Sequence, residues 1–186
     1  MRHRLRAAAA LLGPALAALA LAACAAPAVD TFQAAPAGLA GRAFVRQVEV
    51  VPGPRFKRQA AEADARLEPG DPTTARLIEQ AVAEAARARG LTGERPLRLV
   101  LEMDALAMPG TARSALGAGD RLAGQVRVLD ARSEERLAEF YVDVDRSYPG
   151  LIGQLARGGG VRERLTQAFA ARVAEQLVDP TRRARR

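Results

Sequence analysis

The alternation of apolar and polar side chains between residues 97 and 144 constrains the fold most. It recurs in three successive stretches, residues 97–103, 122–129 and 137–144. Alternation with a period of two predicts half-buried β-strands that turn one face toward a core and the other toward water. The turn at residues 131–136 is short, which favours an antiparallel pair on either side of it. These stretches therefore predict the main part of a mostly antiparallel sheet.

Two amphipathic helices flank these strands. The first follows a helix start at Asp71 or Thr73 and ends at Gly90, where a left-handed residue suits a helix terminus. The second follows residues 158–160 and ends before residues 179–180. Their apolar positions recur at helical spacing. They are Leu77, Ile78, Ala81, Val82 and Ala85 in the first helix, and Val161, Leu165, Phe169, Val173 and Leu177 in the second.

A further strand at residues 44–51 precedes the first helix and stops at a Pro-Gly-Pro sequence. The order is then strand, helix, strand, strand, strand, helix. A helical crossover makes the first two strands parallel if they share a sheet, and short turns make the last three antiparallel. We therefore expect one α+β domain over residues 43–179. It should be a two-layer sandwich with both helices on one face of the sheet.

The first 23 residues are typical of a secretory signal. Three arginines without an acid come first, and about 16 residues of mostly Ala and Leu follow. That apolar run is interrupted by Gly13-Pro14 and is short for a transmembrane helix. It ends in Leu21-Ala22-Ala23-Cys24, which resembles the lipobox of bacterial lipoprotein precursors. The alternatives are an ordinary signal cleaved near residues 25–26, which would discard Cys24, and an uncleaved anchor helix.

The lipobox resemblance implies that the chain is cut before Cys24, the only cysteine. Leu21, Ala22 and Ala23 would then serve signal recognition, and Cys24 would carry diacylglycerol and an N-acyl chain. Several acyl chains hold a protein on a membrane durably. Ala25 stands where an aspartate favours inner-membrane retention, so the implied location is the periplasmic face of the outer membrane. Residues 24–42, rich in Ala, Pro and Gly, are then expected to be a flexible tether.

The net charge of +7 does not indicate a nucleic-acid partner. Three arginines belong to the leader and four to residues 180–186, which we expect to be a basic, disordered tail. The domain between them is close to neutral. The expected partners are a membrane, through the lipid anchor, and an envelope protein.

The domain also lacks the residues of common catalytic sites. His3, the only histidine, lies in the leader, and Cys24 would be acylated, which excludes Ser-His and Cys-His nucleophiles and zinc sites built on them. Carboxylate chemistry, a Ser-Lys pair limited to Lys57, or a bound cofactor remain. The best carboxylate pairs are Asp143 with Asp145 and Glu102 with Asp104. They lie on the faces assigned to solvent, so we expect them to be surface acids.

The long connection before the strand at residue 122 is a candidate interaction loop, because long connections are often functional. It contains Gly110, Arg113, Gly117 and Gly119. Together with Leu129-Asp130-Ala131, these residues resemble a family of bacterial lipoproteins known only as a domain of unknown function. The resemblance transfers no catalytic, cofactor or metal residue. The sequence thus predicts a lipid-anchored envelope protein with a non-enzymatic domain that binds a partner or a lipid, and a carboxylate-dependent hydrolase of cell-wall glycan or peptide is the alternative.

Overall fold

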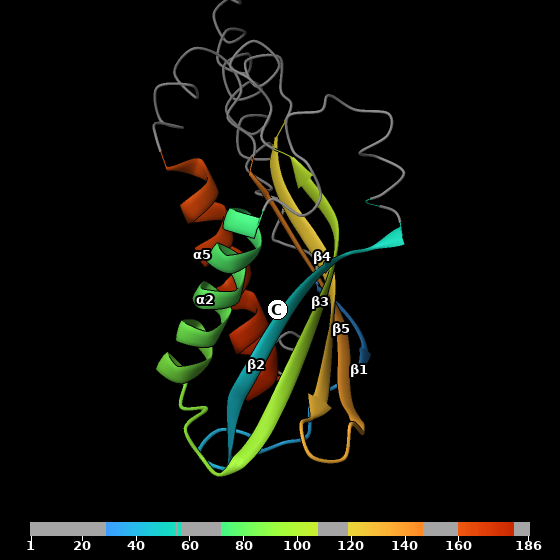
Figure 1. The fold of residues 1–186 in the computed structure, drawn as a ribbon, viewed down its shortest axis with the longest axis vertical. Coiled ribbons are helices and arrows are strands. Elements are labelled where there is room, and N and C mark those ends of the chain that lie inside the picture. The colour runs from blue at the N-terminus through green and yellow to red at the C-terminus, as the bar shows by residue number, and fades with distance from the viewer. Residues whose placement is uncertain (1–28, 55, 57–71, 108–118, 147–159, 181–186) are drawn as a thin grey trace, which may run out of the picture.

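The computed structural model describes residues 29–54, 56, 72–107, 119–146 and 160–180. Five strands and two long helices make up this part of the chain (Figure 1). In chain order they are β1 (Val29–Gln33), β2 (Ala43–Pro52), α2 (Pro72–Ala88), β3 (Arg95–Ala107), β4 (Asp120–Asp130), β5 (Arg136–Arg146) and α5 (Val161–Val178).

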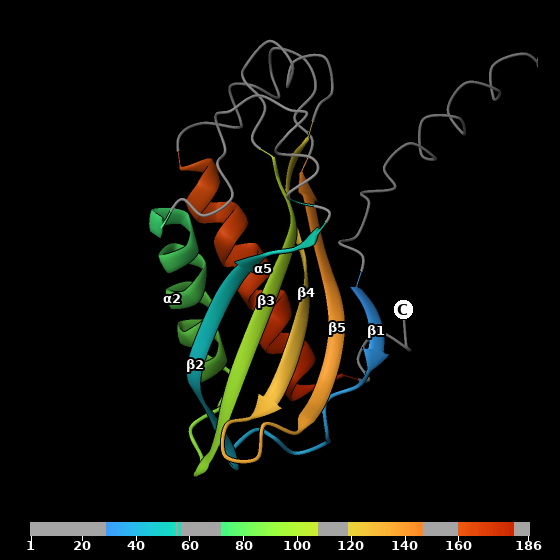
Figure 2. The same cartoon turned by 45° about the vertical axis from the view of Figure 1, so that its right-hand side comes forward.

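The strands form one sheet in the order β1-β5-β4-β3-β2. β2 and β3 are parallel, and the other three neighbouring pairs are antiparallel. Both helices lie on the same face of the sheet, and no helix of the described residues covers the opposite face (Figures 1 and 2). This confirms the predicted α+β sandwich, including the parallel first pair and the antiparallel last three strands. We call the face away from the helices the open face.

The core lies between the sheet and the helices, where the alternation predicts it. Leu99 and Leu101 of β3 and Phe140 of β5 point inward and are 0–1% exposed. Phe169 of α5 and Val82 of α2 meet them from the helix side and are fully buried. Burial of an aliphatic or aromatic side chain of this size stabilises the folded state by about 1.5–3 kcal/mol. The helices are therefore held on the sheet by their apolar faces.

The end of α2 is set by Gly90, as predicted. Gly90 has a φ of +86°, in the left-handed region that glycine adopts without strain. Its amide donates to the carbonyl of Arg87 at 2.9 Å, and the amide of Leu91 donates to the carbonyl of Ala86 at 3.1 Å. These are the two hydrogen bonds of a Schellman motif. Leu91 is fully buried, so the chain turns directly from the helix back into the core.

Residues 29–42 differ from the predicted tether. Residues 29–33 form β1, which pairs with β5 at the edge of the sheet. Ala35 and Leu39 are 5% and 4% exposed and belong to the core, and the amide of Gly41 donates to the carbonyl of Gly90 at 2.7 Å. The small apolar residues, which in the sequence favour a flexible segment, thus allow this segment to pack closely against the rest of the domain. For its described part, the tether prediction is wrong, and the folded domain begins no later than residue 29.

Candidate functional site

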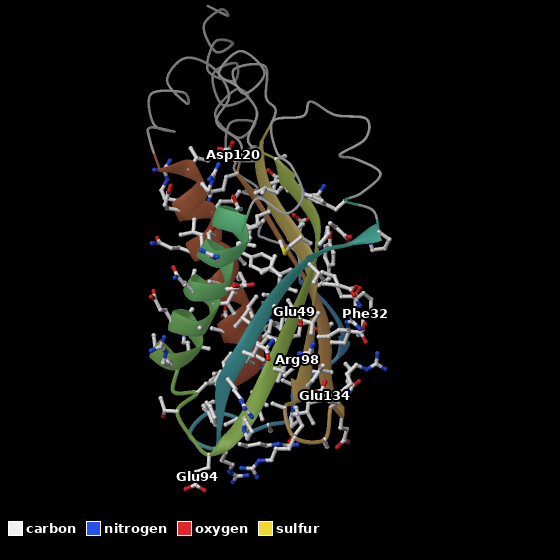
Figure 3. The ribbon with its side chains drawn as sticks, viewed as in Figure 1. Phe32, Glu49, Glu94, Arg98, Asp120 and Glu134 are labelled. Atoms are coloured by element: carbon white, nitrogen blue, oxygen red, sulfur yellow. The ribbon has the colours of Figure 1, made fainter. Side chains whose placement is uncertain are left out.

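The open face of the sheet is covered by charged side chains in ion pairs. Arg98 of β3 lies between two acids, with its guanidinium nitrogens 2.7 Å from Glu49 of β2 and 2.9 Å from Glu134 (Figure 3). The hydrogen bond with Glu49 and the charge of Glu134 raise the pKa of Arg98 above its usual value. Arg98 thus joins strand β2 to the turn between β4 and β5. The Nε atoms of Arg98 and Arg127 are buried without a hydrogen-bond partner.

A second group of ion pairs joins β3, β4 and β5. Arg121 of β4 makes a bidentate contact with Asp143 of β5, through Nε at 3.0 Å and a terminal nitrogen at 2.6 Å. This hydrogen bonding raises the pKa of Arg121. Arg127 of β4 pairs with Glu102 of β3. Because opposite charges face each other across neighbouring strands, the pairs help to fix the register of the sheet.

Tyr141 lies among the acids of the same face. Its exposure is intermediate, and its hydroxyl has a raised pKa. Burial is the largest cause, followed by the charges of Asp104 and Asp143. Asp104 also forms a hydrogen bond with this hydroxyl. A neutral phenol beside these acids can donate a hydrogen bond, which makes it part of the same network.

The structure separates the carboxylates that were weighed as catalytic pairs. Asp143 faces Arg121, Glu102 faces Arg127, and Asp104 faces Tyr141. A Cβ added to Gly119 would lie 2.4 Å from a carboxylate oxygen of Asp145, so Asp145 packs against that glycine. The described residues contain no group of three or more acids, histidines or cysteines placed to hold a metal ion. Three of the four acids therefore have structural partners on the sheet surface.

Most of the other candidate residues lie outside the described part of the chain. This holds for Gly110, Arg113 and Gly117 of the candidate interaction loop, and for the lipobox with Cys24. Gly119 is described: it directly precedes β4, and a side chain at this position would require the carboxylate of Asp145 to move. The tail after residue 180 also lies outside. Within the described residues, no helix combines the length and the apolar character that crossing a membrane requires.

The two edges of the sheet contain features that sequence reasoning missed. On β1, Phe32 is 67% exposed, the one large apolar side chain of the described residues that is exposed. The register shifts between Thr31 and Gln33, so Phe32 is the extra residue of a β-bulge and has no partner on β5. Figure 3 places Phe32 on the side of the sheet remote from the helices. The β-branched residues Val29 and Thr31 around it were the available signal for a strand.

At the opposite edge, a groove of about 260 Å³ runs between β2 and α2. Val45 and Val48 of β2 and Ala83 of α2 contribute apolar surface to it. The rest of its lining is polar or charged: Arg46, Gln47, Glu79, Gln80, Glu84 and Arg87. A carboxylate oxygen of Glu79 accepts a hydrogen bond from the amide of Val50 at 3.3 Å, which bridges the strand and the helix next to the groove. We call this feature the β2–α2 groove.

Fold and surface together define a small α+β sandwich with an open, ion-paired sheet face. No family model matches the chain, so the resemblance of residues 110–131 to a lipoprotein family stays a prediction. No curated protein matches it either. Among solved structures, it is similar to the dodecamer of PelC from Paraburkholderia phytofirmans, known in two crystal forms. These are 14% and 12% identical, cover 82% of this chain and 97% of PelC, and have TM-scores of 0.55.

Two more distant similarities involve a protein from Caulobacter crescentus CB15 provisionally assigned as a lipoprotein and a protein from Xanthomonas campestris assigned to the family DUF330. The first is 18% identical, covers 70% of this chain and 86% of the other, and has a TM-score of 0.38. The second is 11% identical, covers 82% and 91%, and has a TM-score of 0.43. At these identities, the PelC similarity shows a shared fold.

Proposed function

We propose that this chain is a lipid-anchored envelope protein whose α+β domain acts as a non-enzymatic scaffold that binds proteins, copies of itself included. The observation that carries the proposal is Leu21-Ala22-Ala23-Cys24, which places the only cysteine directly after a signal-like leader. In this proposal the mature chain begins with Cys24, acylated on its sulfur and its amino group. With Ala25 as the second residue, it is held on the periplasmic face of the outer membrane.

Two features of the domain support the scaffold part of the proposal. The acids of the open face that would serve a hydrolase, Asp143 and Glu102, face arginines on neighbouring strands. A carboxylate whose oxygens accept hydrogen bonds from a guanidinium is less available to contact a substrate or a water molecule. The second feature is the fold, which is shared with PelC, a protein solved as a dodecamer. A domain of this architecture can therefore serve as the subunit of a larger assembly.

The anchor is tested by expressing the full chain in a Gram-negative host, with Cys24→Ala as the matched variant. We expect the wild type to be cut before Cys24, to carry the mass of its acyl chains and to sediment with the outer membrane. The variant should carry no acyl mass and leave the membrane fraction. A wild type that is unmodified and not associated with the membrane would refute the anchor.

The hydrolase alternative is tested on the same material with peptidoglycan and glycan substrates. If Asp143 were catalytic, Asp143→Asn would abolish hydrolysis without loss of folding. In our proposal neither the wild type nor the variant hydrolyses these substrates. The variant should lose only the contribution of a partly exposed ion pair, about 1 kcal/mol or less. An activity that disappears in Asp143→Asn and persists in Glu163→Gln, a charge-matched change on α5, would establish the hydrolase.

A further inference from the structure

The first strand of the domain combines two features at one edge of the sheet. β1 carries Phe32, the one large apolar side chain of the described residues that is exposed. β1 is also the described element that follows Cys24 most closely in the chain. We infer that the β1 edge rests on the membrane and that Phe32 inserts its ring at the lipid interface, near the acyl chains of Cys24. This inference rests on the proposed lipid anchor and specifies how the anchored domain is oriented on the lipid surface.

The chain between the anchor and β1 is short enough to bring the ring to the lipid. Five peptide steps separate Cys24 from Val29, which gives an extended reach of about 17 Å. Phe32 follows three residues later, roughly 10 Å further along a strand. The backbone of Phe32 therefore stays within about 27 Å of the anchor in any orientation, and it comes much closer to the lipid when β1 lies along the bilayer.

Phe32 is presented from an ordered backbone. The residues on either side of it, Thr31 and Gln33, both pair with β5. The side-chain amide of Gln33 also donates a hydrogen bond to the carbonyl of Leu137 at 3.2 Å. A ring on an ordered strand loses less conformational freedom when it binds than a ring on a loose segment does. The exposed ring is thus prepared for insertion.

The same edge is poorly suited to a protein partner that adds a strand. β1 has only five residues and contains a bulge, and short or bulged edge strands resist pairing with another chain. A lipid interface requires no strand register and accepts aromatic side chains at the level of the headgroups. Glu139, the β5 residue opposite Gln33, forms an ion pair with Arg136 at 2.5 Å. It therefore does not present an unpaired negative charge to lipid phosphates.

This position leaves the rest of the domain accessible to protein partners. β2 is the opposite edge of the sheet, four strand spacings away, or roughly 19 Å at about 4.8 Å per spacing. The helices and the open face lie on either side of the sheet and remain in water (Figure 2). A single ring adds modestly to membrane affinity, but the acyl chains confine it to the lipid surface. The acyl chains thus supply the attachment, and Phe32 supplies the orientation.

Tryptophan fluorescence tests the position of the ring directly, because the chain contains no tryptophan. The full chain with Phe32→Trp is purified with its acyl chains and reconstituted in vesicles of phosphatidylethanolamine and phosphatidylglycerol, with and without bromine on the lipid tails. Bromine quenches an indole only where the indole contacts the lipid. We expect Phe32→Trp to lose most of its emission in the brominated vesicles. Gln47→Trp, at an exposed position of β2, is the matched control and should keep its emission.

Several results would overturn the inference. If the intact mass shows the acyl chains but Phe32→Trp is not quenched, the anchor stands and β1 does not rest on the lipid. Blue-shifted emission without quenching would place the ring against protein instead, such as a second copy of the chain. Equal quenching of Phe32→Trp and Gln47→Trp would contradict the proposed orientation. A protein that carries no acyl mass and does not enter the vesicles would refute the anchor itself, and this inference with it.

Discussion

The opposite environments of two phenylalanines give the sharpest test of the structure. Phe169 lies on the inner face of α5 and is fully buried against the sheet, whereas Phe32 on β1 is 67% exposed. Replacing Phe169 by Ala removes a ring from a close-packed core and should cost about 3–5 kcal/mol of the free energy of unfolding. A small domain has only about 5–15 kcal/mol in total. Phe169→Ala should therefore lower the melting temperature by roughly 6–20 °C.

Phe32→Ala is the matched control, because the same atoms are removed from an exposed site. Its effect on the unfolding of the single chain should stay within about 0.5 kcal/mol. Both variants are measured by urea and thermal unfolding, followed by circular dichroism, on dilute protein so that self-association contributes little. The dilution matters because an assembly that binds only folded subunits adds to the apparent stability.

Two results would refute this reasoning. If Phe169→Ala unfolded within 1 kcal/mol of wild type, α5 would not cover the sheet as described. If Phe32→Ala were as destabilising as Phe169→Ala in dilute protein, Phe32 would belong to the core of its own chain, which would contradict its exposure of 67%.

Two further predictions concern single turns of the fold. Asp130 accepts hydrogen bonds from the amides of Arg132 and Ser133 and from Arg95, which lowers its pKa from 3.8 to about 2, with the Arg132 amide as the largest cause. The stabilisation of the folded state by ionised Asp130 is therefore complete above about pH 4 and is lost as the pH falls toward 2. In urea titrations, Asp130→Asn should be less stable than wild type at pH 7 and equally stable near pH 2. A difference in unfolding free energy that stayed constant with pH would contradict this role of Asp130. Gly90→Ala should lower the free energy of unfolding by about 1–2 kcal/mol, because the φ of +86° is unfavourable for alanine. A steric clash does not contribute, because no atom lies within 4 Å of an added Cβ. Gly90→Asn should be less destabilising, and equal losses for the two variants would point to a steric cause.

The main strands and both helices were predictable because their signal is local. In β5, for example, the inward residues Phe140 and Val142 alternate with outward Tyr141 and Asp143, and burial follows that alternation. Gly90 marked the end of α2 because few other residues adopt its backbone conformation. The solvent-facing position of the acids was predictable for the same reason. Their arginine partners were not, because a pair such as Arg121 with Asp143 depends on the register between two strands.

β1 and the groove could not be predicted because both depend on contacts between distant parts of the chain. β1 has only five residues, lies in a stretch rich in Ala, Pro and Gly, and pairs with residues more than 100 positions later. Its alternation is further broken by the bulge at Phe32. The groove combines a segment of β2 with one of α2, so neither segment signals it alone.

The early start of the domain changes what a lipid on Cys24 would do. A tether through residue 42 would allow about 65 Å of extended chain between Cys24 and β2, at roughly 3.4 Å per residue. With β1 beginning at Val29, the extended reach from Cys24 is only about 17 Å. An acylated Cys24 would then hold the β1 edge within a short distance of the membrane surface. If copies of the chain associate, as in the proposed scaffold function, each copy would contribute its own acyl chains, and linked anchors dissociate far more slowly than single ones. Lipid attachment and self-association would thus reinforce each other, because confinement of the domains near one plane raises their effective concentration for one another.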